Sequence, residues 1–223
     1  MNMNEVRISA GRATLDGNLT TLDRSSALVL FAHGSGSSRH SPRNQFVAHR
    51  LNDAGLATLL FDLLTPDEEA VDLYTRKHRF DVDLLAERLV YATKWVRARG
   101  ETRDLRVGYF GSSTGAAAAL MAAAELPDPI SAVVSRGGRP DLAGEALPKV
   151  KAPTLLIVGG EDHVVIGMNE EARARMRCEV KIDIVFGATH LFEEPGALER
   201  VAGLAANWFL RHASGARESF TST

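Results

Sequence analysis

Short runs of strand-forming residues alternate with segments of helical periodicity along most of this chain, and this alternation limits the folds open to it. The strand-forming runs are rich in valine, leucine, isoleucine and phenylalanine, as expected of parallel strands covered on both faces. They span residues 27–32, 57–64, 105–110, 132–135, 154–158 and 180–186. The segments with apolar residues three and four positions apart span residues 43–54, 81–99, 113–126, 168–177 and 195–212. The pattern predicts an α/β fold: a doubly wound, mostly parallel sheet with helices on both faces.

Two alternating segments, 6–10 and 13–20, lie on either side of Gly11 and predict an antiparallel entry to the sheet. The longest polar connection, residues 65–80, is interpreted as a surface loop, with a partial lid over the site as the alternative. In a doubly wound sheet the ligand site lies beyond the carboxyl ends of the strands. We therefore expect the candidate functional residues directly after the end of each strand.

Length and composition narrow the class of protein. The 223 residues predict one domain over residues 1–213 and a flexible C-terminal tail over 214–223. Lysine and arginine total 26 against 28 acidic residues, so no basic field attracts nucleic acid or an anionic membrane. The N-terminus lacks a signal-peptide pattern, no apolar run reaches the roughly 20 residues of a membrane span, and the one cysteine suits a reducing compartment. We expect a cytoplasmic protein with a small-molecule substrate; the sequence predicts no oligomeric state.

A G-x-S-x-G pattern occupies residues 111–115, between the strand at 105–110 and the helix that follows. In a sharp strand-to-helix turn, flanking glycines let the backbone fold back closely and the serine oxygen stands clear of the sheet edge. Ser113 is therefore the candidate nucleophile.

The first parallel strand ends in a glycine-rich turn at residues 33–38, which exposes backbone N–H groups at the same edge. We expect the N–H groups of Ser35 and Thr114 to form an oxyanion hole. The turn lacks the G-x-x-x-x-G-K-[ST] phosphate signature. His33 is interpreted as a residue that braces this turn rather than as a catalytic base.

An acid and a histidine follow two later strands. Asp162 comes after the strand at 154–158 and is the preferred orienting carboxylate, with Glu161 and Asp141 as alternatives. His190 comes after the strand at 180–186. The chain order of serine, acid and histidine, each just past a strand end, predicts a catalytic triad. The histidines lack the H-E-x-x-H spacing and one cysteine cannot build a thiolate zinc site, so we expect neither a metal nor a cofactor.

The chain resembles the α/β-hydrolase superfamily and, within it, the dienelactone hydrolase-like esterases. Four segments between Leu28 and Phe209 carry the resemblance: F-A-H-G-S-G-S at 31–37, G-S-S-T-G at 111–115, V-G-G-E-D at 158–162 and G-A-T-H at 187–190. The resemblance implies an α/β-hydrolase fold with little or no cap domain, and an activity on small esters. Residues 35–44 and 190–196 are also similar to the hydrolase module that is sometimes fused to a phosphoribosyltransferase, although no transferase segment is found in this sequence.

The sequence departs from the resemblance at the nucleophile. Dienelactone hydrolases use a cysteine where this chain has Ser113, so ester hydrolysis is expected rather than dienelactone as the substrate. Those enzymes also bind a substrate carboxylate through arginines. Arg136, Arg139 and Arg39 are candidates for that role here, with internal ion pairs, such as one between Arg139 and Asp141, as the alternative.

Three functional hypotheses follow. The leading one is a serine esterase that acts on small carboxylic esters or lactones through an acyl-enzyme. The same residues also suit hydrolysis of an amide, thioester or phosphotriester. The third hypothesis is a ligand-binding protein that kept the fold without turnover.

Overall fold

The computed structural model describes residues 1–126 and 130–213, and the tail expected at 214–223 lies outside the described residues. One sheet organises this part of the chain, with strand order β1-β2-β4-β3-β5-β6-β7-β8. β1 and β2 form an antiparallel hairpin, β2 pairs antiparallel with β4, and the remaining pairs are parallel. The strands are β1 (Asn2–Ala10), β2 (Ala13–Thr21), β3 (Ala27–Ala32), β4 (Ala57–Phe61), β5 (Arg106–Ser112), β6 (Ile130–Arg136), β7 (Thr154–Gly159) and β8 (Val180–Val185).

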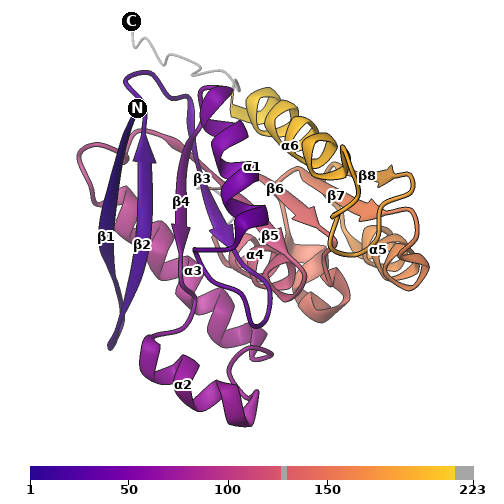
Figure 1. Ribbon diagram of the computed structural model, residues 1–223, viewed down its shortest axis with the longest axis horizontal. Coiled ribbons are helices and arrows are strands. Elements are labelled where there is room, and N and C mark those ends of the chain that lie inside the picture. The colour runs from indigo at the N-terminus through magenta and orange to yellow at the C-terminus, as the bar shows by residue number, and fades with distance from the viewer. Residues whose placement is uncertain (127–129, 214–223) are drawn as a thin grey trace, which may run out of the picture.

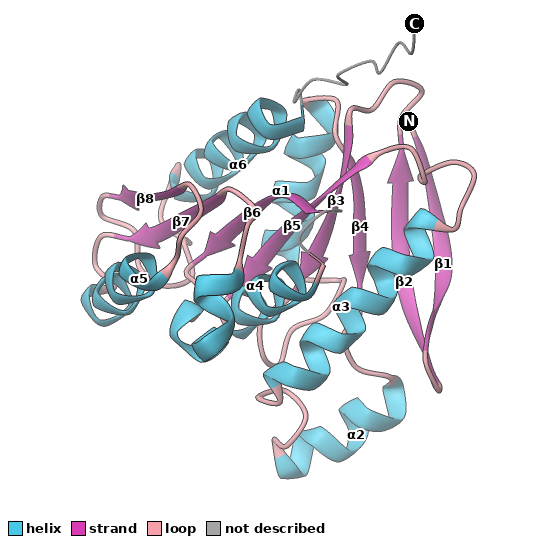
Figure 2. Cartoon of the chain, turned by 180° about the vertical axis from the view of Figure 1, so that it is seen from behind, coloured by secondary structure: helices cyan, strands magenta, loops and turns pink. Residues whose placement is uncertain are grey.

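Helices cover both faces of the sheet, as the sequence predicts. Helices α1 (Pro42–Asp53) and α6 (Ala197–Ala213) lie in front of the sheet in Figure 1. Figure 2 shows α3 (Val82–Arg97), α4 (Thr114–Glu125) and α5 (His163–Arg175) on the opposite face. Each face has its own apolar core, and the alanines of α4 let that helix pack closely on the central strands. None of the helices in the described ranges is both long and apolar enough to cross a membrane.

The connection at 65–80 is more ordered than the sequence analysis expects. It contains helix α2 (Pro66–Thr75), which stands below the sheet in Figure 1. Thr65 caps this helix: its hydroxyl accepts from the Glu68 N–H, the Glu68 carboxylate accepts from the Thr65 N–H, and Pro66 occupies the first turn. A capping box with proline at this position is a strong helix start, so this signal outweighs the polar composition.

Several element boundaries differ from the prediction, and the start of α5 differs most among the helices. Helix α5 begins at His163 rather than at residue 168, because the β-branched residues of its first turn obscure the helical pattern in the sequence. Residues Pro140–Lys149, between β6 and β7, form a 3-10 segment with a kink at Gly144.

Candidate active site

Ser113 lies in a strained turn between β5 and α4. Its backbone has φ 50° and ψ −121°, a conformation that residues other than glycine rarely adopt. The flanking glycines make the turn possible: a Cβ on Gly115 would lie 2.2 Å from the carbonyl oxygen of Ala32, and one on Gly111 would lie 2.4 Å from the Ala116 Cα. Such strain persists only where the surrounding structure enforces it, and it concentrates at functional sites.

Asp162 and His190 meet at the same edge of the sheet. Asp162 is half-buried at the start of α5, and its Oδ2 lies 2.7 Å from Nδ1 of His190, in the loop after β8. Of the two alternative acids, Glu161 is exposed, and Asp141 is bound by the guanidinium of Arg139. Asp162 is therefore the candidate carboxylate that the fold brings to the imidazole.

The Ser113 turn and the His190 loop lie next to each other. The Ser113 N–H faces the carbonyl of Arg136 at 3.4 Å, and a Cβ on the following Gly137 would lie 3.6 Å from His190 Cε1. Among the hydrogen bonds of the described residues, none joins the Ser113 hydroxyl to His190. Hydrogen bonds between catalytic groups commonly tighten only in the substrate complex.

His33 holds the glycine-rich turn, as expected. Its ring is buried; Nδ1 donates to the Gly34 carbonyl at 3.0 Å and Nε2 accepts from the Leu63 N–H at 3.0 Å. This pair of contacts fixes the neutral tautomer with the proton on Nδ1. Burial lowers the pKa of His33 below its ordinary value of 6.5, against weaker opposing effects of Gly34 and nearby acids. A Cβ on Gly34 would lie 3.1 Å from the Ser113 Cβ, so the braced turn packs directly on the candidate nucleophile.

The two amides expected to bind an oxyanion are both available. Thr114 is the first residue of α4, where an N–H group has no intrahelical acceptor. Within the described residues, no backbone acceptor pairs with the N–H of Ser35. Donors left free beside a strained serine are the arrangement that a developing negative charge requires.

Asp72 and Arg79 support this turn from the side of α2, and the sequence analysis missed both. The Asp72 side chain is 1% exposed and accepts from the His78 N–H at 2.6 Å and from Nε of Arg79. A Cβ on Gly36 would lie 3.2 Å from Arg79 Nη1, which places the arginine against the glycine-rich turn. An acid inside a charged run gives no sequence signal of burial.

The three candidate arginines have different environments. Arg139 forms a two-point ion pair with Asp141 at 2.9 and 2.7 Å, and Arg39 pairs with Asp62 through both its guanidinium and its N–H. The pair between Arg139 and Asp141 is the alternative that the sequence analysis names, and it is confirmed; a role of either arginine in substrate binding stays a prediction. Arg136 is 8% exposed and forms no ion pair among the described residues.

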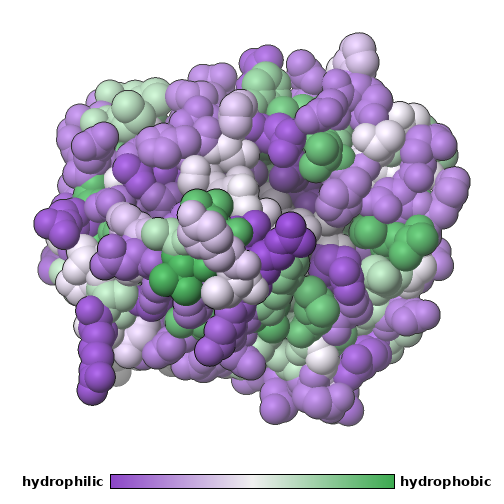
Figure 3. Space-filling model, turned by 60° about the horizontal axis from the view of Figure 1, so that its bottom comes forward, coloured by the Kyte–Doolittle hydropathy of each residue, from purple (hydrophilic) through white to green (hydrophobic). Residues whose placement is uncertain are grey.

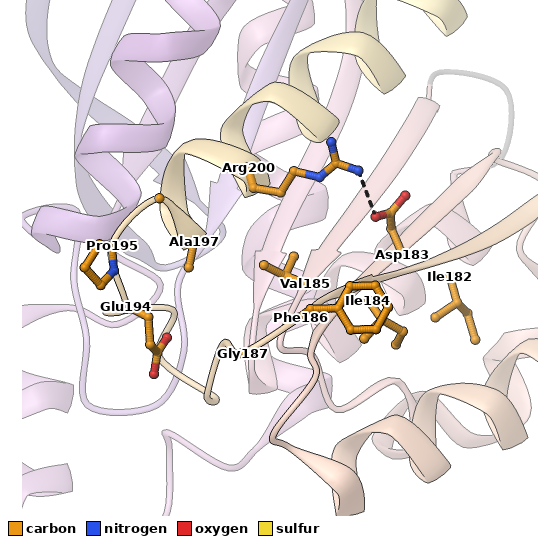
Figure 4. A pocket seen from close by; sticks show the side chains of 11 residues that line it. Ile182, Asp183, Ile184, Val185, Phe186, Gly187, Glu194, Pro195, Ala197 and Arg200 are labelled. Atoms are coloured by element: carbon orange, nitrogen blue, oxygen red, sulfur yellow. Dashed lines mark ion pairs between the residues drawn. The ribbon is translucent and has the colours of Figure 1, made fainter.

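The face of the molecule that carries α2 mixes apolar and polar side chains, as Figure 3 shows. An open groove of about 780 Å³ lies elsewhere, along the free edge of β8 and the start of α6. Figure 4 shows Asp183 paired with Arg200 on one side of this groove and Phe186 beside it. Neither Ser113 nor His190 lines the groove, so it is separate from the candidate site.

Comparison with known proteins identifies the family. The family model described as "Dienelactone hydrolase family" matches residues 20–211. The chain belongs to the dienelactone hydrolase family. A dienelactone hydrolase from Anabaena variabilis is 58% identical, has a TM-score of 0.93, and aligns over 95% of this chain and 98% of its own. The fold is thus the α/β-hydrolase fold, and the family supports hydrolysis as the activity.

Two other relatives differ in length or in sequence. A Mycobacterium tuberculosis protein provisionally named a phosphoribosyl transferase is 55% identical over 211 residues, which are 95% of this chain and 47% of that protein. The chain therefore spans about half the length of the curated relatives it matches. Est1E from Butyrivibrio proteoclasticus shares the fold, with a TM-score of 0.77 and 16% identity over 93% of this chain and 98% of its own.

Proposed function

We propose that this member of the dienelactone hydrolase family is a serine hydrolase that cleaves small carboxylic esters or lactones through an acyl-enzyme. The observation that carries the proposal is the 2.7 Å contact between Asp162 and His190, at the sheet edge where Ser113 has a strained turn. The family supports an ester or lactone hydrolase in general. The assignment of a serine nucleophile and of this triad is our own.

In the proposed reaction, the Ser113 hydroxyl attacks the substrate carbonyl carbon while Nε2 of His190 accepts its proton. Asp162 accepts a hydrogen bond from Nδ1–H, which fixes the tautomer and stabilises the imidazolium that forms. The N–H groups of Ser35 and Thr114 bind the oxyanion, each contributing about 3–4 kcal/mol to the transition state. His190 then protonates the departing alcohol.

The second half of the reaction repeats these steps with water. Water attacks the acyl-enzyme as His190 takes its proton, and collapse of the second tetrahedral intermediate releases the acid and restores the Ser113 hydroxyl. His33 supports this mechanism as a neutral residue. Both of its ring nitrogens are hydrogen-bonded within the protein, so His33 keeps the proposed oxyanion turn in place and does not compete for the proton of Ser113.

The test is hydrolysis of a series of p-nitrophenyl esters of increasing acyl length. Ser113→Ala should lower kcat by at least about 10³-fold on every ester that the wild type cleaves, because triad residues act as a unit. Ser112→Ala is the matched control. Ser112 is adjacent and buried, and its hydroxyl donates to Asn44 at 3.2 Å rather than to the site. We expect it to retain activity within about tenfold and to lose about 1 kcal/mol of stability.

Two results would count against the proposal. One is a Ser113→Ala variant that keeps most of its activity, which would remove this hydroxyl from the mechanism. The other is an equal loss in the Ser112 and Ser113 variants, which would indicate a structural effect on the turn.

A further inference from the structure

The last strand, β8, forms a free edge of the sheet. It ends the strand order and, among the described residues, pairs with β7 alone. Its register with β7 runs from Val180 to Val185 without a bulge, and its sequence, V-K-I-D-I-V, holds no proline. A row of unpaired backbone groups attracts another strand, so edges that stay unpaired usually carry bulges, prolines or unmatched charges. β8 lacks the first two of these devices.

The outer side of β8 is open to solvent. A groove of about 780 Å³ runs along this strand, beside residues 194–197 and Arg200. Figure 4 shows Asp183 turned towards Arg200 of α6 and Ile182 on the other side of the strand. Phe186, directly after β8, is 92% exposed, so a large aromatic side chain lies in solvent at this edge. A strand of another molecule therefore has room to reach the β8 backbone.

The hydrogen bonds to β7 determine which backbone groups of β8 face outward. The Thr154 N–H donates to the Glu179 carbonyl at 2.8 Å, and the Gly160 N–H donates to the Val185 carbonyl at 2.9 Å. The N–H and C=O of one residue lie on the same side of a strand, and that side alternates along the strand. The odd-numbered residues of β8 therefore face β7. The outward groups belong to the even-numbered residues Val180, Ile182 and Ile184.

Lys181 and Asp183 carry opposite charges on one face of β8, with Ile182 between them. Nζ of Lys181 lies 3.0 Å from Oδ2 of Asp183, and Arg200 reaches the other carboxylate oxygen at 3.6 Å. The Lys181 side chain is 57% exposed, whereas that of Asp183 is 13% exposed. Lys181 therefore has room to contact a second carboxylate across the free edge.

These charges favour one register of β8 with a copy of itself. Two copies related by a two-fold axis pair antiparallel, and the residue on the axis defines the register. With Ile182 on the axis, Lys181 lies opposite Asp183 of the second copy, and symmetry repeats this contact. With Lys181 or Asp183 on the axis, that residue lies opposite itself, and like charges directly opposite each other are unfavourable. Registers centred nearer either end overlap fewer residues.

The same register pairs the outward backbone groups of β8. Ile182 lies opposite Ile182 of the second copy, and Val180 lies opposite Ile184. Each of these residues has its N–H and C=O on the outer side, so each pair exchanges two hydrogen bonds. Charge and backbone geometry therefore agree on one pairing, and its two halves are supplied by the same sequence.

From this self-complementary free edge we infer that β8 pairs antiparallel with β8 of a second copy of the chain. The product is a two-fold dimer with one sheet continuous across both molecules and with its axis at Ile182. Phe186 then lies beside the residues that precede Val180 of the second copy, which covers its ring. The inference does not depend on the proposed function, because neither Ser113 nor His190 lines this edge.

The first test is sedimentation velocity of the full chain between about 1 and 100 µM, where the wild type should show a concentration-dependent dimer. Lys181→Glu places carboxylates opposite each other on both sides of the axis and should raise the dimer Kd at least about 10-fold. Arg12→Glu makes the same charge change in the exposed turn between β1 and β2 and should leave Kd unchanged. A wild type that stays monomeric at 100 µM (about the top of the range), or a dimer that Lys181→Glu does not weaken, would overturn the inference.

A mixture of two charge variants tests the register. Asp183→Lys places lysines opposite each other, so this variant and Lys181→Glu should each dimerise weakly when alone. Paired with each other, the two variants present opposite charges on both sides of the axis. An equimolar mixture should therefore dimerise with a Kd within about fivefold of the wild-type value. Two folded variants that stay monomeric when mixed would contradict the pairing of Lys181 with Asp183.

Ile182→Pro tests the pairing without a change of charge. The Ile182 N–H faces outward, so proline leaves the hydrogen bonds to β7 in place and removes those on the dimer axis. This variant should stay monomeric at about 100 µM, with a far-ultraviolet circular dichroism spectrum like that of the wild type. A dimer as tight as that of the wild type would place the interface elsewhere and overturn the inference.

Discussion

At the scale of the residue, two histidines that both follow a strand end differ in what their ring nitrogens contact. Both nitrogens of His33 are engaged within the core, at 3.0 Å each. His190 has a side chain that is 40% exposed, with Nδ1 against Asp162 and Nε2 without a partner among the described residues. The first histidine braces a turn, whereas the second has one nitrogen free for proton transfer.

The buried His33 predicts a pH dependence of stability. The pKa of His33 in the folded protein lies below 6.5, mainly because of burial. Its contribution to the free energy of unfolding is therefore fully present above pH 6.5 and is lost as the pH falls through the folded pKa. Urea unfolding measures the fall in the free energy of unfolding between about pH 7.5 and about pH 5.5, and this fall should be larger in the wild type than in His33→Gln. The pKa of His212 is also lowered by burial, so His212→Gln is the parallel control. Equal losses in the wild type and His33→Gln would rule out this role for His33.

At this scale a residue's place can be predicted where its position in the chain determines it, whereas the choice between alternative roles depends on a side-chain partner that only the fold identifies. Ser113 and His190 follow strands whose carboxyl ends must meet at one edge of the sheet. Arg39 and Arg139 follow strands too, yet each binds an acid that the fold brings near it. The distinction between a free and a paired guanidinium needs the tertiary structure.

At the scale of the element, the close approach of β5, α4 and β3 sets the geometry of the candidate nucleophile, Ser113. Gly115 at the start of α4 lies against the last carbonyl of β3, and Gly111 lies against α4 itself. The alternation of strands and helices in the sequence is enough to predict these elements. Their boundaries are less predictable where a capping box or β-branched residues in a first turn compete with composition, as in α2 and α5.

This packing predicts opposite effects of the same substitution at two glycines. Gly115→Ala should lower the free energy of unfolding by about 3 kcal/mol or more, because its Cβ meets backbone atoms that cannot move aside. Gly203→Ala in α6 meets no atom within 4 Å, and alanine favours a helix over glycine by about 1 kcal/mol. Urea denaturation of the two variants checks the prediction. A Gly115→Ala protein as stable as the wild type would contradict the described turn.

At the scale of the whole molecule, the proposed site joins parts of the chain that are far apart in sequence. The glycine-rich turn follows β3 and Ser113 follows β5 near the middle of the sheet, while Asp162 and His190 follow β7 and β8 near one edge. The loops after β7 and β8 bring Asp162 and His190 into contact at 2.7 Å, and Figure 1 shows β7 and β8 side by side. The global fold was predictable from the sequence because each parallel strand contributes its loop to the same edge.

The most direct measurement of the central claim is covalent labelling of the wild-type protein with a serine-directed fluorophosphonate, followed by peptide mass spectrometry. We predict one adduct, on Ser113, with labelling abolished in His190→Ala because the hydroxyl then lacks its proton acceptor. Ser112, one position away and bonded to Asn44, should remain unmodified. A protein that stays unlabelled, or one labelled at another serine while Ser113 is untouched, would contradict the account.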